Sequence, residues 1–419
     1  MLNKYSGYRF QKIIIVGAAL CLLTGADPLV ADTCEAIQES AANSEDDASV
    51  ISVHCGGAPS ATLDENGRLW VTFVQDEHVY ISQSHDRGQR FVLPVMVNPS
   101  PEDAEFNGEN RPKIIVDGDD VYLSWTRKTS ANFTGEIRFS KSSDGGKTFT
   151  EPRTVNDDNL FTGHRFESLM LTESGHLYLV WLDKRDMEAS LERGDDYAGA
   201  AAYYAVSSDR GETFSRNFRV ANNSCECCRI AMAPHGDDQV AIFWRHIFDE
   251  TTRDHAFAVL TPTGAVENQN RATYDDWQIN ACPHHGPAMA AAEEGSYHIS
   301  WFSNGSNHSG IYYAQYEADS ASIRHLRQVD GAAGAGHPQL AEFKGNVYLI
   351  WKGFDGLNTQ LRLISSSDNG ATWSEPMVVM STGEASDHPL LVKHTSGLYL
   401  SWLTEEHGYV FEELSNANP

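Results

Sequence analysis

"SSDRGETF", residues 207–214, is a turn that the chain repeats three more times, starting at residues 84, 142 and 366. In each copy a short Asp side chain can accept hydrogen bonds from nearby backbone N–H groups. The Gly supplies a left-handed backbone conformation, and the closing Phe or Trp is a candidate core residue. Four copies of one turn indicate a structural unit that is itself repeated.

A second repeat surrounds the turn. An alternating apolar run ends in an aromatic residue at positions 73, 125, 181, 244, 301, 351 and 402, a period of about fifty residues. Each run lies between two other strand-like segments, and the Ser–Asp–Gly turn follows the third segment. One unit is therefore a four-stranded antiparallel meander. Such sheets bury both faces only against one another, in a closed ring.

We therefore predict an all-β fold, a β-propeller of seven four-stranded antiparallel blades, with six blades as the alternative. The last unit, residues 385–414, lacks its fourth strand. The segment "ASVISVH", residues 48–54, is a candidate to supply that strand and close the ring.

The turn pattern S-x-D-x-G-x-x-[FW] resembles the Asp-box, or BNR repeat, of the sialidase-like β-propellers, over about residues 50–415. Cys-x-Cys-Cys at 225–228 and Cys-Pro-His-His-Gly-Pro at 282–287 resemble an exported bacterial subgroup of these propellers. The resemblance implies that the turns are peripheral and structural. It also implies a sialidase-type glycoside hydrolase, whose chemistry needs three arginines for a substrate carboxylate, a tyrosine nucleophile with a glutamate, and an acid/base aspartate.

The candidates for that chemistry are Arg111, Arg165, Arg229 and Glu167. The three arginines come from consecutive blades, whereas sialidase arginines are dispersed around the ring. The chain also has no FRIP-like motif. Sialidase activity is therefore an alternative and not the leading interpretation.

The N-terminus has the features of an export signal: a basic start followed by the apolar run 13–25. We expect a signal peptide at 1–31, an N-terminal segment at 32–47 and one propeller domain at 48–415, in a periplasmic or secreted protein. An uncleaved membrane anchor is the alternative. No later segment is long and apolar enough to span a bilayer.

The charge of the chain restricts its partners. The formal net charge is −27. Residues 1–31 contribute three positive charges and one negative charge, so the remainder carries about −29. Such a surface repels nucleic acid and anionic membranes.

Cysteines and histidines gather where the repeat register places the start of each innermost strand, at one mouth of the central channel. Thiolates and imidazoles that converge there suit copper(I), zinc or iron, and export favours copper over zinc. We predict a metal or small-ligand site whose ligands are Cys225, Cys227, Cys228, Cys282, His284 and His285, with His164, His337 and His388 as additional candidates.

One other interpretation remains open. The cysteines of 225–228 and Cys282 can instead pair in disulfides, and Cys34 with Cys55 can form a second bridge. The protein is then a non-catalytic propeller that binds a protein or a glycan at the channel mouth.

Overall fold

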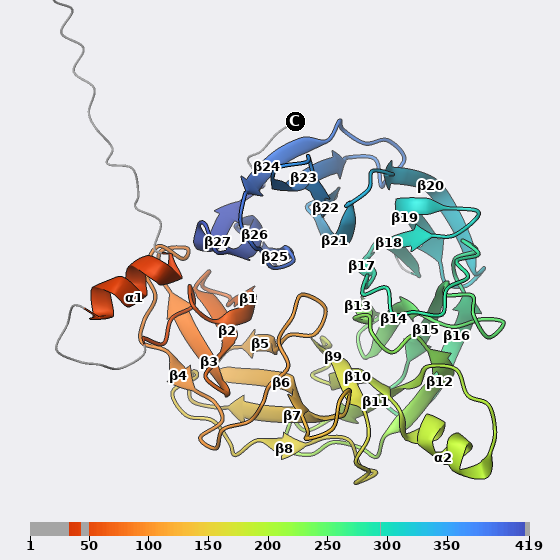
Figure 1. Ribbon diagram of the computed structural model, residues 1–419, viewed down its shortest axis with the longest axis horizontal. Helices are drawn as coiled ribbons and strands as arrows, with labels where there is room; N and C mark the ends of the chain where they lie inside the picture. Colours follow the sequence, from red (N-terminus) through yellow and green to blue (C-terminus); the bar gives the residue numbers. More distant parts are fainter. Residues whose placement is uncertain (1–32, 43–49, 294, 415–419) are drawn as a thin grey trace, which may run out of the picture. The chain divides into compact units, whose positions relative to one another are not determined.

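The computed structural model describes residues 33–42, 50–293 and 295–414. Its strands form seven antiparallel sheets arranged as the blades of a propeller (Figure 1), which confirms the predicted all-β fold and the count of seven. The predicted signal peptide, residues 1–31, lies outside the described residues.

The blades follow one another in chain order, and each runs from its innermost to its outermost strand. The strands are β1 Gly57–Leu63, β2 Leu69–Gln75, β3 His78–Ser84 and β4 Val95–Met96; β5 Lys113–Asp117, β6 Asp120–Lys128, β7 Gly135–Ser142 and β8 Arg153–Thr154; β9 His164–Leu171, β10 Leu177–Asp183, β11 Ala200–Ser207 and β12 Phe218–Ser224; β13 Ala231–His235, β14 Gln239–Arg245, β15 His255–Leu260 and β16 Val266–Arg271; β17 Ala288–Ala291, β18 Ser296–Asn304, β19 Ser309–Glu317 and β20 Ser322–Asp330; β21 Gly336–Phe343, β22 Asn346–Phe354, β23 Thr359–Ser366 and β24 Met377–Thr382; and β25 Leu390–His394, β26 Gly397–Thr404 and β27 Gly408–Glu413.

The innermost strands close the ring. Each contacts the innermost strand of the next blade, and β25 contacts β1. The core lies between neighbouring sheets, where the second strand of every blade contributes one fully buried tryptophan: Trp70, Trp125, Trp181, Trp244, Trp301, Trp351 and Trp402. Each indole N–H has an acceptor, as a buried donor requires; Trp181, for example, donates to Asp183 over 2.8 Å.

The repeated turns lie between the third and fourth strands of blades one, two, three and six. In the turn after β7, the Asp144 carboxylate accepts the backbone N–H groups of Lys147 and Thr148, both over 3.0 Å. Gly146 has the left-handed φ of 75° that the turn requires. The repeated turn is therefore a structural feature at the corner of a blade and gives no information about the residues at the hub.

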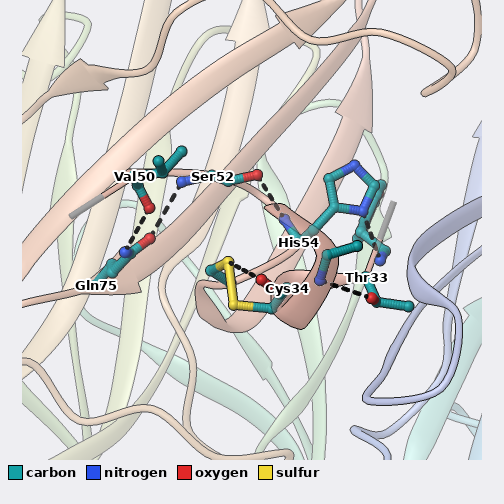
Figure 2. The surroundings of a disulfide bond; sticks show 9 residues. Thr33, Cys34, Val50, Ser52, His54 and Gln75 are labelled. Carbon is teal, nitrogen blue, oxygen red and sulfur yellow. Dashed lines mark hydrogen bonds between the residues drawn. A yellow bond between two sulfur atoms is a disulfide. The ribbon is translucent and has the colours of Figure 1, made fainter. Parts of the chain in front are cut away.

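The seventh blade departs from expectation in one respect. Among the described residues, its sheet contains only β25, β26 and β27, and residues 50–54 form no strand beside them. The Gln75 side chain instead forms hydrogen bonds with the backbone of this segment. It accepts one from the Ser52 N–H over 3.2 Å and donates one to the Val50 carbonyl over 3.0 Å (Figure 2). Val53 packs into the core between the first and seventh blades, so the segment contributes side chains to this core without extending a sheet.

Two short helices complete the described chain, α1 Cys34–Ala42 and α2 Arg185–Arg193. A disulfide joins Cys34, at the start of α1, to Cys55 (Figure 2), as the second-bridge interpretation expected. Neither helix has the length and apolar character needed to cross a bilayer.

Candidate functional site

Three thiols lie together where the chain passes from blade three to blade four. Cys225, Cys227 and Cys228 occupy the connection between β12 and β13 and are 1–3% exposed. The Cys225 and Cys227 sulfurs are 3.6 Å apart, and those of Cys227 and Cys228 are 3.8 Å apart. All three cysteines are free.

These separations are too long for a disulfide, and they fall in the range of both thiol–thiol contacts and metal-bound thiolates. Bonded sulfurs are about 2.05 Å apart. Three thiolates bound to one ion at about 2.3 Å stand about 3.8–4.0 Å from one another. The thiols are therefore already spaced as the ligands of a single thiophilic ion.

A fourth free thiol comes from the next blade. Cys282 precedes β17 and, unlike the other three, is exposed. A hydrogen bond from Cys227 lowers the pKa of Cys282 to about 7, against the opposing effect of burial. His284 is exposed on the same loop, and its Nδ1 lies 3.0 Å from the Cys282 carbonyl oxygen.

Two buried guanidiniums stand beside the thiols without a carboxylate partner among the described residues. Arg245 donates to the carbonyls of Arg253, His285 and Phe302, and its Nε has no acceptor. Arg253 donates to Ile279, and its Nη1 has no acceptor. A buried cation without a counter-ion is costly, so both arginines favour negative charge on the sulfurs.

Cys228 is the thiol that this environment ionises. Burial opposes a charge on it. Hydrogen bonds from Cys225 and Cys227, together with the charge of Arg245, outweigh that effect and hold the pKa of Cys228 well below its ordinary value. The cluster thus offers a thiolate, the form of cysteine that binds metals.

A second polar centre forms around Glu109, which precedes β5 and is 3% exposed. Its Oε1 accepts from Arg229 over 2.7 Å and from His337 Nδ1 over 3.0 Å. Its Oε2 accepts the backbone N–H groups of Gly286 over 2.8 Å and Arg229 over 3.2 Å. Burial would raise the pKa of Glu109, but the charge of Arg229 and the His337 hydrogen bond lower it below the ordinary range.

Three imidazoles stack beside this carboxylate. The His285 and His337 ring centroids are 4.6 Å apart and those of His337 and His388 3.5 Å apart, with interplanar angles of 26° and 23°. We call these three residues the imidazole column. Burial lowers the pKa of His285 to about 4 and that of His388 to about 2, so both rings are neutral near pH 7.

The stacking argues against one ion bound by neighbouring rings of the column. The Glu109, His337 and His388 ligand atoms do lie within 4.8 Å of one another. However, a metal about 2.0–2.1 Å from a ring nitrogen must lie near the plane of that ring. Two nearly parallel rings that face each other at 3.5 Å share no such point.

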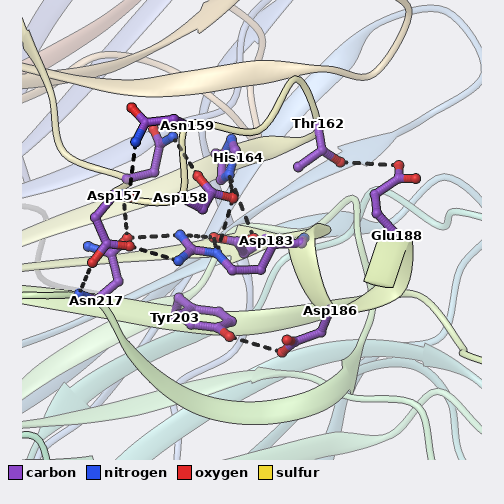
Figure 3. Close-up of polar contacts among 12 residues, drawn as sticks. Asp157, Asp158, Asn159, Thr162, His164, Asp183, Asp186, Glu188, Tyr203 and Asn217 are labelled. Atoms are coloured by element: carbon purple, nitrogen blue, oxygen red, sulfur yellow. Dashed lines mark hydrogen bonds and ion pairs between the residues drawn. The ribbon is translucent and has the colours of Figure 1, made fainter. Parts of the chain in front are cut away.

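His164 lies apart from both centres. Its Nε2 is 2.9 Å from Asp158 and its Nδ1 is 2.8 Å from the Gly135 carbonyl, with Asp183 nearby (Figure 3). Burial opposes protonation, but the Asp158 hydrogen bond and the two carboxylates raise the pKa of His164. The residue is fully buried, and both ring nitrogens are used within blade three and its neighbour.

The three candidate arginines are each paired with a carboxylate of the chain. Arg111 contacts Asp387 over 2.8 Å, Arg165 Nε contacts Glu105 over 2.7 Å, and Arg229 contacts Glu109. None is left free to grip a substrate carboxylate in this arrangement.

Glu167 lies in a buried pair beside the hub. It accepts from Thr126 over 2.8 Å and lies 3.9 Å from Lys113 Nζ, and burial raises its pKa. Burial disfavours the charged form of Lys113 as well, and lowers the pKa of this amine to about 8. Lys113 lines a hub cavity of about 300 Å³ together with Ser60 and Gln339.

Comparison with known proteins supports the fold. No family model matches the chain, and no curated protein is significantly similar to it. Among solved structures, it resembles the PL25 ulvan lyase bound to a GlcA–Rha3S unit, with a TM-score of 0.55 and 13% identity over 86% of this chain and 96% of the other.

Two further solved propellers show weaker likeness. The NanB sialidase of Streptococcus pneumoniae has a TM-score of 0.46 and 11% identity, over 72% of this chain and 66% of that one. The α-L-arabinofuranosidase Arb93a of Fusarium graminearum has a TM-score of 0.45 and 14% identity, over 71% and 88%. At such identities the likeness concerns the fold alone.

The structure therefore divides the predicted metal ligands. It brings Cys225, Cys227 and Cys228 together, with Cys282 beside them at Glu226. It places His285, His337 and His388 in the imidazole column and leaves His164 apart. Sequence reasoning did not single out Glu109, although it directly precedes the predicted hub residues Asn110 and Arg111.

Proposed function

We propose that this protein is an exported β-propeller that binds one soft metal ion at Cys225, Cys227 and Cys228, with Cys282 at the edge of the site. The observation that carries the proposal is the spacing of the three free sulfurs, 3.6 and 3.8 Å, in a site that is almost closed to solvent. The imidazole column is not part of this site.

The charge balance and the donor set favour copper(I) over zinc. Three thiolates suit copper(I), which is soft, whereas structural zinc takes four protein ligands in a tetrahedron. The complex of one copper(I) with three thiolates is negative, and Arg245 and Arg253 supply nearby positive charge. Zinc remains the alternative if Cys282 is a permanent fourth ligand.

Metal analysis of the purified protein tests the proposal. Protein purified without reductant is assayed for metal and for free thiols, and is then titrated with copper(I) against a chromogenic chelator. We expect the protein to bind one copper per chain and the Cys228→Ser variant to bind none. The control is the double variant Cys34→Ser/Cys55→Ser, which removes the disulfide and should still bind one copper. No bound metal, with the four sulfurs oxidised to disulfides, overturns the proposal.

Export is part of the proposal and rests on residues 1–31. Expression of the whole chain in bacteria, followed by cell fractionation and N-terminal sequencing, tests it. We expect the mature chain outside the cytoplasm with its N-terminus after Ala26 or Ala31. Retention of the intact leader in the cytoplasm contradicts export.

A glycan ligand in the hub is a second candidate. The observation in its favour is the hub cavity, which has a mainly apolar lining, and to which Ser60 contributes a buried hydroxyl with no hydrogen-bond partner in the described chain. The pairing of the three arginines argues against a sialidase in particular. Release of a fluorophore from sialosides and from neutral glycosides tests both, and loss of a measured activity in Lys113→Met would place the substrate in this cavity.

A further inference from the structure

We infer that the thiol cluster is loaded by ligand exchange through Cys282, so that this protein accepts its ion from a thiol-bearing copper(I) donor. The inference rests on the proposed function and adds the route by which the ion reaches the thiol cluster. Its first observation is a contrast in exposure. Cys225, Cys227 and Cys228 are only 1–3% exposed, whereas Cys282 is exposed, and its Sγ lies 4.0 Å from Oε1 of Glu226, the residue between Cys225 and Cys227.

The other sides of the cluster are closed by the fold. Cys225, Cys227 and Cys228 belong to an apolar core cluster that includes Leu182 and Trp244. The Cys225 backbone N–H is bonded to the Arg245 carbonyl over 3.0 Å, which fixes the cluster against β14. Among the described residues, the exposed sulfur that borders the cluster is that of Cys282, which lies beside Glu226.

Cys282 lies on the loop of residues 279–286, which we call the arch. Both ends of the arch are hydrogen-bonded to other parts of the protein. The Ile279 N–H donates to the Thr251 carbonyl over 3.2 Å, and the Gly286 N–H donates to Glu109 over 2.8 Å. Between these anchors, residues 280–284 form no strand, and Ala281, Cys282 and His284 are exposed. A donor molecule can therefore reach the Cys282 sulfur without any opening of the blades.

The exchange needs no oxidant or reductant, because copper stays in the +1 state throughout. The Cys282 sulfur forms a bond to copper as one donor sulfur leaves, and the Cys282 thiol proton passes to solvent. Cys227 then loses its thiol proton and bonds to the same ion while the remaining donor thiolate departs. Cys228, as a thiolate, and Cys225, which also releases its proton, complete the three-sulfur set as the bond to Cys282 breaks. The three protons released by Cys282, Cys227 and Cys225 are balanced by one taken up again at Cys282 and one at each of the two departed donor thiolates.

Stopped-flow loading from a copper(I)–glutathione complex tests this route, with thiolate-to-copper charge-transfer absorbance as the signal. We expect Cys282→Ser to load about tenfold more slowly or slower still, yet to reach one copper per chain with an affinity close to that of the unaltered protein. Asn280→Ser is the matched control, since it changes an exposed side chain on the same arch, and its loading rate should be unchanged.

Each other outcome has one meaning. If Cys282→Ser loads at the normal rate, the route is wrong although the thiol cluster binds copper. If Cys282→Ser binds no copper, Cys282 is a permanent ligand and the exchange step is wrong. If the unaltered protein itself takes no copper from either glutathione or free copper(I), the proposed function fails and the route fails with it.

Discussion

The thiol cluster and the imidazole column form opposite kinds of polar centre in one propeller. In the column, Glu109 accepts four hydrogen bonds and His337 uses Nδ1 in one of them. At the thiols, sulfurs stand at metal-ligand spacing, and Arg245 and Arg253 keep buried N–H groups without acceptors. The comparison teaches that the Glu109 carboxylate is satisfied by its neighbours, and that the unpartnered buried atoms of the column are imidazole nitrogens of His285 and His388, whose pKa values burial lowers. At the thiols, by contrast, the unpartnered atoms belong to cationic guanidiniums.

The largest effect that tests this difference is expected from Glu109→Gln. The substitution leaves the Arg229 guanidinium, whose side chain is 13% exposed, without its counter-charge. Breaking a buried ion pair by removal of one partner costs about 3–5 kcal/mol. Urea unfolding should therefore show a loss of that order in the free energy of unfolding, with copper stoichiometry unchanged.

The control for Glu109 is Asp195→Asn. Asp195 pairs with Arg193, and the two side chains are 60% and 61% exposed. An exposed pair contributes about 0–1 kcal/mol, so this variant should unfold almost as the unaltered protein does. If Glu109→Gln is equally harmless, the Glu109–Arg229 pair does not stabilise the fold. If Glu109→Gln abolishes copper binding, the two centres are not independent.

A smaller effect should appear in the pH dependence of stability. His285 has an ordinary pKa of 6.5 and a folded-state pKa of about 4. Below pH 6.5 the unfolded chain binds a proton at this imidazole and the folded chain does not. The free energy of unfolding is therefore highest above pH 6.5 and decreases as the pH falls to about 4. One such group changes the free energy of unfolding by up to about 1.4 kcal/mol per pH unit in this window.

The measurement is a series of urea titrations of metal-free protein between pH 7 and 4. His285→Gln should lose less stability on acidification than the unaltered protein, by the slope of one proton. His325→Gln, which alters an exposed imidazole on β20, should retain the full slope. Equal slopes in both variants would mean that His285 is protonated in the folded state and that the column is not neutral.

The fold could be predicted because its signals recur. A buried tryptophan in every second strand and a turn after the third strand repeat often enough to fix strand order and blade number. The missing strand of the seventh blade was harder. Residues 48–54 alternate like a strand, but the Gln75 side chain takes up backbone groups of the segment, and no local pattern predicts that competition.

The candidate site was predictable in part for a similar reason. Repeat register brought the cysteines of two adjacent blades together, since neighbouring inner strands must meet. It did not separate His284 from His285. His284 has a left-handed φ of 51°, and only His285 joins the stack. Nor did it find Glu109, whose partner Arg229 lies 120 residues further along the chain.

The smallest effect is expected from Arg253→Gln, which tests the surplus of positive charge at the thiols. Arg253 is 8% exposed, and its Nη1 has no acceptor in the described chain. A copper(I)–thiolate complex is negative, so loss of this cation should weaken copper binding, by less than about tenfold because Arg245 remains. Competition titrations at low and high salt measure the affinity, and burial should keep the loss nearly independent of salt. Arg193→Gln removes an equal charge from an exposed position and should change the affinity only at low salt. An affinity of Arg253→Gln equal to that of the unaltered protein would show that the sulfurs carry no charge that these arginines balance, and the distinction between the two centres would then rest on spacing alone.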